Sequence, residues 1–295
     1  MFYWLAKYLA GPLLRVVYRP WVRGGENIPS TGPAILAGNH LAVIDSFFLP
    51  IMVPRRISFI GKADYVEGRG VKGRLIAGFM RGVGLIPVDR RGGAAALEAL
   101  RTGLKILEDG GLFGIYPEGT RSPDGRRYRG KTGVARLALE SGAPVIPVAM
   151  IGTNIAQPVG KRIPKLIRTG MVIGEPMDFS RFAGMENDRL VLRSITDEIM
   201  YQLMMLSGQE YVDVYAATMK ARLAAGAPTP SSESEPAAPG GRPRPEVLRP
   251  PEPPADDDDE TPGDTTGDTG DETPGDTSGD TTGDTTGDTK NANPS

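Results

Sequence analysis

The stretch Pro33-Ala34-Ile35-Leu36-Ala37-Gly38 is followed directly by Asn39 and His40. Its apolar run is typical of a buried strand, and Asp45 begins a predicted short helix over 45–53 that Pro54 closes. His40 is the only histidine in 295 residues. Imidazole exchanges a proton near neutral pH, and a nearby carboxylate can orient the ring. By itself the spacing also fits an unrelated histidine and aspartate, but it makes His40 and Asp45 candidate catalytic residues.

The remaining elements alternate between strands and helices. Strands are expected over 56–61, 84–88, 111–115, 145–150 and 168–174, and helices over 71–81, 94–107, 133–141, 187–205 and 209–223. This alternation predicts an α/β fold with a mixed, largely parallel sheet flanked by helices. His40, Asp89-Arg90 and Glu118 each follow a predicted strand. Because ligand groups gather at the carboxyl ends of such strands, we expect these residues to share one edge of the sheet.

The chain divides into three parts by composition. The α/β domain is predicted over residues 23–227. Residues 228–295 are Pro-rich and then acidic with Gly-Asp-Thr repeats, and this composition predicts a disordered tail. The tail has 4 basic and 17 acidic residues, which leaves 30 basic and 19 acidic residues in 1–227. The tail therefore carries a charge of −13 and the rest about +11. A basic domain suits anionic partners, and the tail either serves as a solvating appendage or docks on the basic face.

Residues 1–22 interleave Trp, Tyr and Phe with Lys and Arg, as interfacial helices do. The uncharged stretch between Lys7 and Arg15 has seven residues, far short of the roughly 20 that span a bilayer. The segment also lacks the features of a signal peptide. We expect an amphipathic, membrane-associating helix, and the alternative is a helix docked on the domain's own core.

Cysteine is absent, which excludes disulfides, thiolate metal sites and a cysteine nucleophile. With one histidine and no cysteine, a zinc site has almost no ligands available. The Gly-Asp-Thr repeats also lack the spacing of known calcium-binding loops. The sequence therefore predicts no metal and no cofactor.

Three further segments accompany the first. They are Gly84-Leu85-Ile86-Pro87-Val88-Asp89-Arg90, Tyr116-Pro117-Glu118-Gly119-Thr120-Arg121 and Val145-Ile146-Pro147-Val148. In this order and spacing, with Asn39, His40 and Asp45 first, they resemble the four sequence blocks of the glycerolipid acyltransferase family. The resemblance covers roughly residues 20–205 and is greatest to the bacterial lysophosphatidate (acylglycerolphosphate) acyltransferases. Tyr116 stands where the family commonly has phenylalanine.

The resemblance implies that His40 is the general base that takes the proton from a substrate hydroxyl while Asp45 orients its ring. It also implies a binding site for the substrate phosphate at Arg121, to which Glu118, Gly119 and Thr120 of the same block contribute. Glu118 would orient Arg121 or neighbouring loop donors, and Gly119 would let the backbone approach closely. Arg90 and Lys62 are further phosphate-binding candidates.

The segment from Arg121 to Lys131 also holds Arg126, Arg127 and Arg129. These cations could face phosphate, an anionic acyl carrier or lipid headgroups, or they could form a solvated basic loop. The expected co-substrate is a thioester of coenzyme A or acyl carrier protein, and the expected partners are a lysophospholipid and the membrane surface. We expect a peripheral or monotopic protein at the cytoplasmic face of the cell membrane.

The leading hypothesis is the transfer of a fatty acyl group to lysophosphatidate, giving phosphatidate. The same chemistry on another lysophospholipid, glycerol phosphate or a glycolipid is an alternative, because the blocks specify only hydroxyl and phosphate. A non-catalytic lipid-binding protein would leave His40, Asp45 and Glu118 without a purpose. Nucleic-acid binding is the weakest hypothesis, since the arginines form no recognisable reading motif and the tail is acidic.

Overall fold

The computed structural model describes residues 2–62, 70, 74, 78, 84–88, 94–161 and 163–226. Asp89, Arg90, most of the predicted helix over 71–81 and the predicted tail over 228–295 lie outside this part of the chain. The contacts divide the chain into Met1–Pro251 and Glu252–Ser295, and every element below belongs to the first unit.

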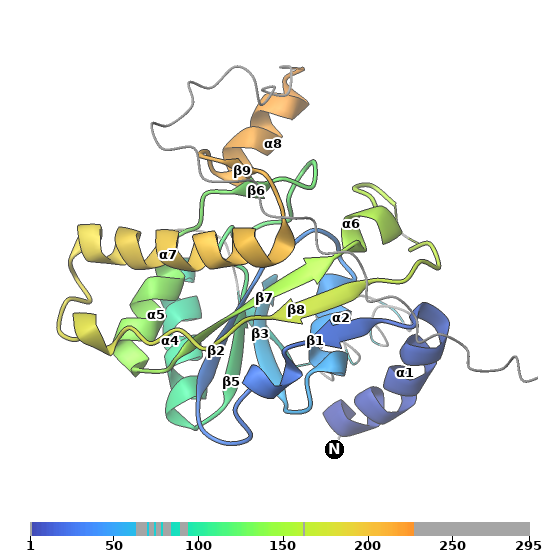
Figure 1. The fold of residues 1–295 in the computed structure, drawn as a ribbon, viewed down its shortest axis with the longest axis horizontal. Helices are drawn as coiled ribbons and strands as arrows, with labels where there is room; N and C mark the ends of the chain where they lie inside the picture. The colour runs from blue at the N-terminus through green and yellow to red at the C-terminus, as the bar shows by residue number, and fades with distance from the viewer. Residues whose placement is uncertain are drawn as a thin grey trace, which may run out of the picture. The chain divides into compact units, whose positions relative to one another are not determined.

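A sheet with the strand order β1-β8-β7-β2-β5-β3-β4 forms the centre of the domain (Figure 1). The strands are β1 (Trp21–Arg23), β2 (Ala34–Gly38), β3 (Ile57–Lys62), β4 (Leu85–Val88), β5 (Leu112–Ile115), β7 (Val145–Ile151) and β8 (Gly170–Ile173). Strands β7, β2, β5, β3 and β4 run parallel. Strand β8 is antiparallel to β7, and β1 pairs with β8 in parallel. The predicted mixed, largely parallel sheet is confirmed.

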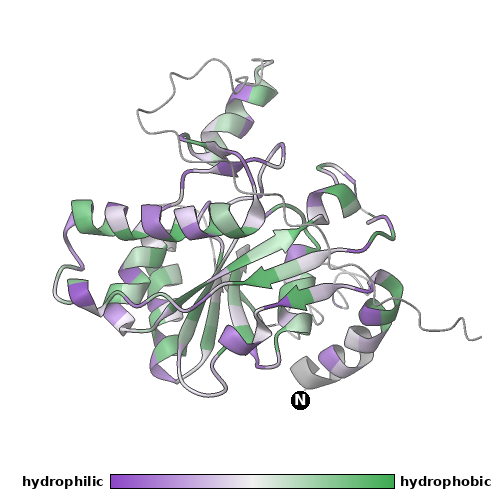
Figure 2. Cartoon of the chain, viewed as in Figure 1, coloured by the Kyte–Doolittle hydropathy of each residue, from purple (hydrophilic) through white to green (hydrophobic). Residues whose placement is uncertain are grey.

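Strand β2 is covered on both faces, which explains its continuous apolar run. Ala34 and Leu36 join the core beneath α2 (Asp45–Met52), whereas Ile35 and Ala37 join the opposite core. That second core is built with α4 (Ala94–Glu108), α5 (Gly133–Ser141) and α7 (Arg189–Ser207). Burial of each such Leu or Ile contributes about 1.5–3 kcal/mol. In Figure 2 the strands at the centre of the sheet are correspondingly apolar.

Helix α1 (Phe2–Tyr18) packs against α2. Leu14 and Tyr18 contact the core, and the Tyr18 ring meets Phe48 edge-on at a centroid distance of 5.3 Å. The Lys7 ammonium turns inward and donates hydrogen bonds to the carbonyl oxygens of Val53 and Pro54, which satisfies the end of α2. The helix ends at Tyr18, short of the predicted boundary, because Trp21–Arg23 join the sheet as β1.

The predicted helix over 209–223 is wrong in its first half. Tyr211–Val212 form strand β9, which pairs with β6 (Arg127–Tyr128), and only α8 (Ala216–Ala224) is helical. An aromatic and a β-branched residue favour a strand once a partner strand is available. Tyr128, Val212, Ala216 and Met219 bury one another in a small separate core. This core fixes α8 beside the loop that follows β5.

The short helix α6 (Thr153–Ala156) and the 3-10 turns Gly25–Asn27 and Ser180–Phe182 complete the described elements. Among the described residues, no helix is both long enough and apolar enough to cross a bilayer.

Candidate active site

His40 and Asp45 lie together at the carboxyl end of β2. The His40 Nδ1 atom is 3.1 Å from Asp45 Oδ2, and the same oxygen accepts the backbone N–H groups of Leu41 (2.7 Å) and Ala42 (2.8 Å). Asp45 is fully buried at the first turn of α2, where the helix dipole favours a carboxylate. Its position is therefore fixed by the turn itself. Within the described part of the chain, the other ring nitrogen, Nε2, has no hydrogen-bond partner.

The imidazole of His40 stacks on Tyr116, with a centroid distance of 4.1 Å and an angle of 12° between the planes. Gly38 leaves room for this tyrosine, since a Cβ atom there would lie 3.2 Å from its ring. The Tyr116 hydroxyl is 3.5 Å from Ser46 Oγ, and burial raises its pKa, which keeps it protonated. The plane of the imidazole is thus set by a ring that directly follows the neighbouring strand β5.

The backbone ties the loop after β5 to the histidine. Ser122 N–H donates to the His40 carbonyl at 2.7 Å. Asn39 is fully buried, and its side chain both accepts from Met150 N–H (2.6 Å) and donates to Met150 O (3.0 Å) on β7. Since β2, β5 and β7 end at the same edge, the predicted convergence of His40 and Glu118 is confirmed. Arg90 lies outside the described residues, so its phosphate-binding role stays a prediction.

Glu118 is buried and faces Arg127. Its Oε1 is 3.8 Å from Arg127 Nη1, and its Oε2 accepts the Tyr128 N–H at 3.3 Å. Burial raises the pKa of Glu118 to about 7, although Arg127 opposes the shift. Of the two alternatives from the sequence, the structure supports the second, because Glu118 holds neighbouring loop donors.

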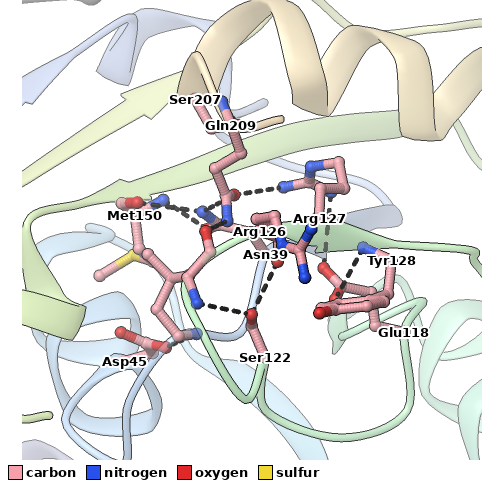
Figure 3. Close-up of polar contacts among 12 residues, drawn as sticks. Asn39, Asp45, Glu118, Ser122, Arg126, Arg127, Tyr128, Met150, Ser207 and Gln209 are labelled. Atoms are coloured by element: carbon pink, nitrogen blue, oxygen red, sulfur yellow. Dashed lines mark hydrogen bonds and ion pairs between the residues drawn. The ribbon is translucent and has the colours of Figure 1, made fainter. Parts of the chain in front are cut away.

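Arg127 is not part of a solvated basic loop. Its side chain is fully buried, and it donates to Gln209 Oε1 at 3.0 Å while its guanidinium pairs with Glu118. Gln209 also accepts from Asn39 Nδ2 at 2.8 Å and donates to Gly125 O, so that one amide joins three segments (Figure 3). Arg126 pairs with Asp124 at 2.7 Å. The neighbouring residues Arg126 and Arg127 therefore have different partners and different roles in the loop.

Three other cations gather around Gly119 and Thr120. Lys220 of α8 donates to Thr120 Oγ1 at 2.6 Å. Burial lowers the pKa of Lys220, and the Arg121 guanidinium lowers it further, whereas Glu118 has the opposite effect. Lys131 lies over Gly119, since a Cβ atom there would be 3.1 Å from its Nζ. Several cations around one loop favour the binding of an anion there.

Lys220 was missed by the sequence reasoning. It lies about 100 residues from Thr120 in sequence, in a helix that carries no motif. Gly119 has a φ of 73°, which suits glycine and exposes the backbone of the loop. Lys62 is the last residue of β3, and its phosphate-binding role stays a prediction. Among the described residues, no three side chains of the kinds that hold a metal ion lie together.

A mixed α/β sheet that brings a histidine–aspartate pair and a Glu-Gly-Thr-Arg loop to one edge has the features expected of a glycerolipid acyltransferase. Residues 19–151 match the family model described as Acyltransferase. This match includes all four sequence blocks, and it confirms the resemblance to the acyltransferase family that they indicated.

Relatives with known names agree with this family. The chain is 28% identical over 160 residues to the chloroplastic 1-acyl-sn-glycerol-3-phosphate acyltransferase BAT2 of Brassica napus. This match covers 54% of this chain and 44% of that protein. It is also 27% identical over 169 residues to the 1-acyl-sn-glycerol-3-phosphate acyltransferase of Bacillus subtilis (strain 168), and this match covers 55% of this chain and 78% of that protein. The chain thus spans about half the length of several curated relatives that it matches.

A solved structure is also similar. It is the crystal structure of the 1-acyl-sn-glycerophosphate (LPA) acyltransferase PlsC from Thermotoga maritima, with a TM-score of 0.51 and 25% sequence identity. The match covers 68% of this chain and 77% of that chain. It extends the similarity of fold beyond the residues that the family model matches.

Proposed function

We propose that this protein transfers a fatty acyl group from an acyl thioester to the free hydroxyl of lysophosphatidate, forming phosphatidate. The names of the relatives support this activity and acceptor. The observation that carries the proposal is the 3.1 Å contact between His40 Nδ1 and Asp45 Oδ2. With its proton on Nδ1 and directed at Asp45, the imidazole has a lone pair on Nε2 for the substrate.

In the proposed reaction, the acceptor hydroxyl oxygen attacks the thioester carbonyl carbon while Nε2 of His40 takes its proton. The new C–O bond forms, the C–S bond breaks, and the proton passes to the departing thiolate. Asp45 stabilises the imidazolium, and Tyr116 holds its plane. Positioned proton transfer of this kind is typically worth about 10²–10⁴-fold. No acyl-enzyme is required, since the thioester is already activated.

The acceptor phosphate is bound by Arg121 and Lys220, with the backbone of Gly119 and Thr120 alongside. The hydrogen bond from Lys220 to Thr120 and the proximity of Arg121 support this assignment. A guanidinium fork suits a phosphate with two parallel hydrogen bonds. Arg90 and Lys62 remain further candidates for the same phosphate.

The acyl donor is a thioester of coenzyme A or acyl carrier protein, and it acts as co-substrate without a metal or other cofactor. The protein works at the membrane surface, on the cytoplasmic face, where the lysophospholipid is found. The exposed apolar face of α1 supports this location, because Leu13, Val16 and Val17 point away from the domain.

The test is an acyl-transfer assay with purified full-length protein. One acyl-coenzyme A is offered with lysophosphatidate, glycerol 3-phosphate, lysophosphatidylglycerol or a glycolipid, and the lipid products are identified by mass spectrometry. We expect phosphatidate as the main product, formed together with one free thiol per acyl group. A product formed only from one of the other acceptors would replace lysophosphatidate as the substrate. Thioester use with none of them would contradict the proposal.

A further inference from the structure

The segment from α6 to β8 presents an exposed row of large apolar side chains. Ile155, Val159, Ile163 and Leu166 are 62%, 60%, 85% and 72% exposed, respectively. Most exposed apolar side chains occur singly and need no explanation, but four highly exposed ones within twelve positions stand out from that pattern. We call these four residues the 155–166 patch.

The charge around the patch has one sign. Lys161, Lys165 and Arg168 are exposed in the same segment, and the sequence has no acidic residue from Gly152 to Gly174. Apolar side chains that alternate with lysine and arginine match the two parts of an anionic bilayer surface, its acyl chains and its phosphates. A protein partner would require an apolar surface with acidic groups at matching positions, whereas an anionic membrane supplies both over any area.

The end of the segment that carries the patch lies beside the end of α1. Strands β1 and β8 pair in parallel with Trp21 opposite Gly170, so the residues that precede each strand run alongside one another. Arg168 Nε donates to Arg19 O at 3.2 Å, and Ile167 packs against the same core as Leu14 and Tyr18. The sequence also has no acidic residue before Glu26. Two apolar and basic segments, α1 and the one that carries the patch, therefore lie toward the same side of the domain (Figure 1).

The same segment contacts the turn that holds the catalytic pair. Gln157 is buried, and its Oε1 accepts the backbone N–H of Ile44 at 3.0 Å, next to Asp45. A membrane contact at the patch would thus bring the His40 turn close to the bilayer, where the hydroxyl of a lysophospholipid lies.

From these observations we infer that the 155–166 patch is a second membrane-inserting element, which acts with α1 to seat the His40 turn against anionic lipid. The inference rests on the proposed function only for the identity of the lipid acceptor. The binding of the patch to lipid stands independently of it.

The test uses full-length protein and vesicles of phosphatidylethanolamine with about 30% phosphatidylglycerol as the anionic lipid. The variant is Ile163→Glu/Leu166→Glu, and the matched control is Leu190→Glu, at an 81% exposed leucine in the first turn of α7. Because all three positions are highly exposed, circular dichroism should show the same folded state for each protein. We expect the double variant to bind vesicles about tenfold or more weakly, and the control to bind like wild type.

Activity separates this inference from the proposed function. With a short-chain lysophosphatidate below its micelle concentration, the double variant should match wild type, and with vesicle-bound acceptor it should be slower. Equal vesicle binding by the double variant and Leu190→Glu would overturn the inference. No transfer by wild type to the soluble acceptor would contradict the proposed function and leave the binding result intact.

Replacing Lys161 and Lys165 with Gln should reduce the dependence of binding on phosphatidylglycerol, and an unchanged dependence would also count against the inference.

Discussion

The backbone N–H of Ser122 donates a 2.7 Å hydrogen bond to the carbonyl oxygen of His40. This bond joins the turn that carries the proposed base to the loop that carries Arg121. Since the bond uses only backbone atoms, it adds to the side-chain links that Gln209 makes between the same two segments. In the proposed function, this link would help to hold the acceptor between the His40 imidazole and the Arg121 guanidinium.

Tyr116 should matter through its ring and not through its hydroxyl. Tyr116→Phe keeps the 4.1 Å stack on His40 and should retain kcat within about twofold, whereas Tyr116→Ala loses it. We expect kcat of the alanine variant to fall about tenfold or more, because the imidazole is then free to rotate. Initial rates at saturating substrate measure both. If phenylalanine were as damaging as alanine, the hydroxyl contact with Ser46 would be the important one.

Lys220→Met should weaken acceptor binding. The change removes the ammonium near Thr120 and Arg121 but keeps a stem of similar length. We expect the KM for lysophosphatidate to rise about tenfold with little change in kcat, as for an interaction made equally in the ground and transition states. Lys105→Met, at an exposed position in the last turn of α4, is the matched control. An unchanged KM would remove Lys220 from the phosphate site.

Glu118 should make stability depend on pH. Burial raises the pKa of its carboxyl group to about 7, so between about 4.5 and about 7 the folded state binds a proton that the unfolded state releases. The contribution of this group to the free energy of unfolding therefore falls as pH rises through this window. Urea unfolding of wild type and Glu118→Gln at a series of pH values from about 5 to about 8 measures this pH dependence of the free energy of unfolding. We expect the glutamine variant to lose this downward component, and an identical pH profile for both proteins would refute the shift.

The sequence predicted most of the sheet because its strands are short apolar runs whose local pattern is sufficient. Strand β2 is the clearest case, since both of its faces are buried. The helix predicted over 209–223 failed because Tyr211–Val212 pair with Arg127–Tyr128, residues that are distant in sequence. Local propensity contains no information about such a partner.

The candidate site was predictable where residues are close in sequence, as His40 and Asp45 are. Arg127 and Arg121 look alike in sequence, but in the structure Arg127 is fully buried and pairs with Glu118. Lys220 joins the site through the small core of Tyr128, Val212, Ala216 and Met219, which assembles only in three dimensions. Charged residues without a motif are thus the part of a site that a single sequence reveals least.

The most direct measurement is the rate of thiol release and phosphatidate formation by His40→Ala, compared with wild type under saturating acyl-coenzyme A and lysophosphatidate. The account predicts that kcat falls by about 10²–10⁴-fold, while circular dichroism and the KM for lysophosphatidate stay near wild type. Undiminished turnover by folded His40→Ala would contradict the assignment of this histidine as the general base.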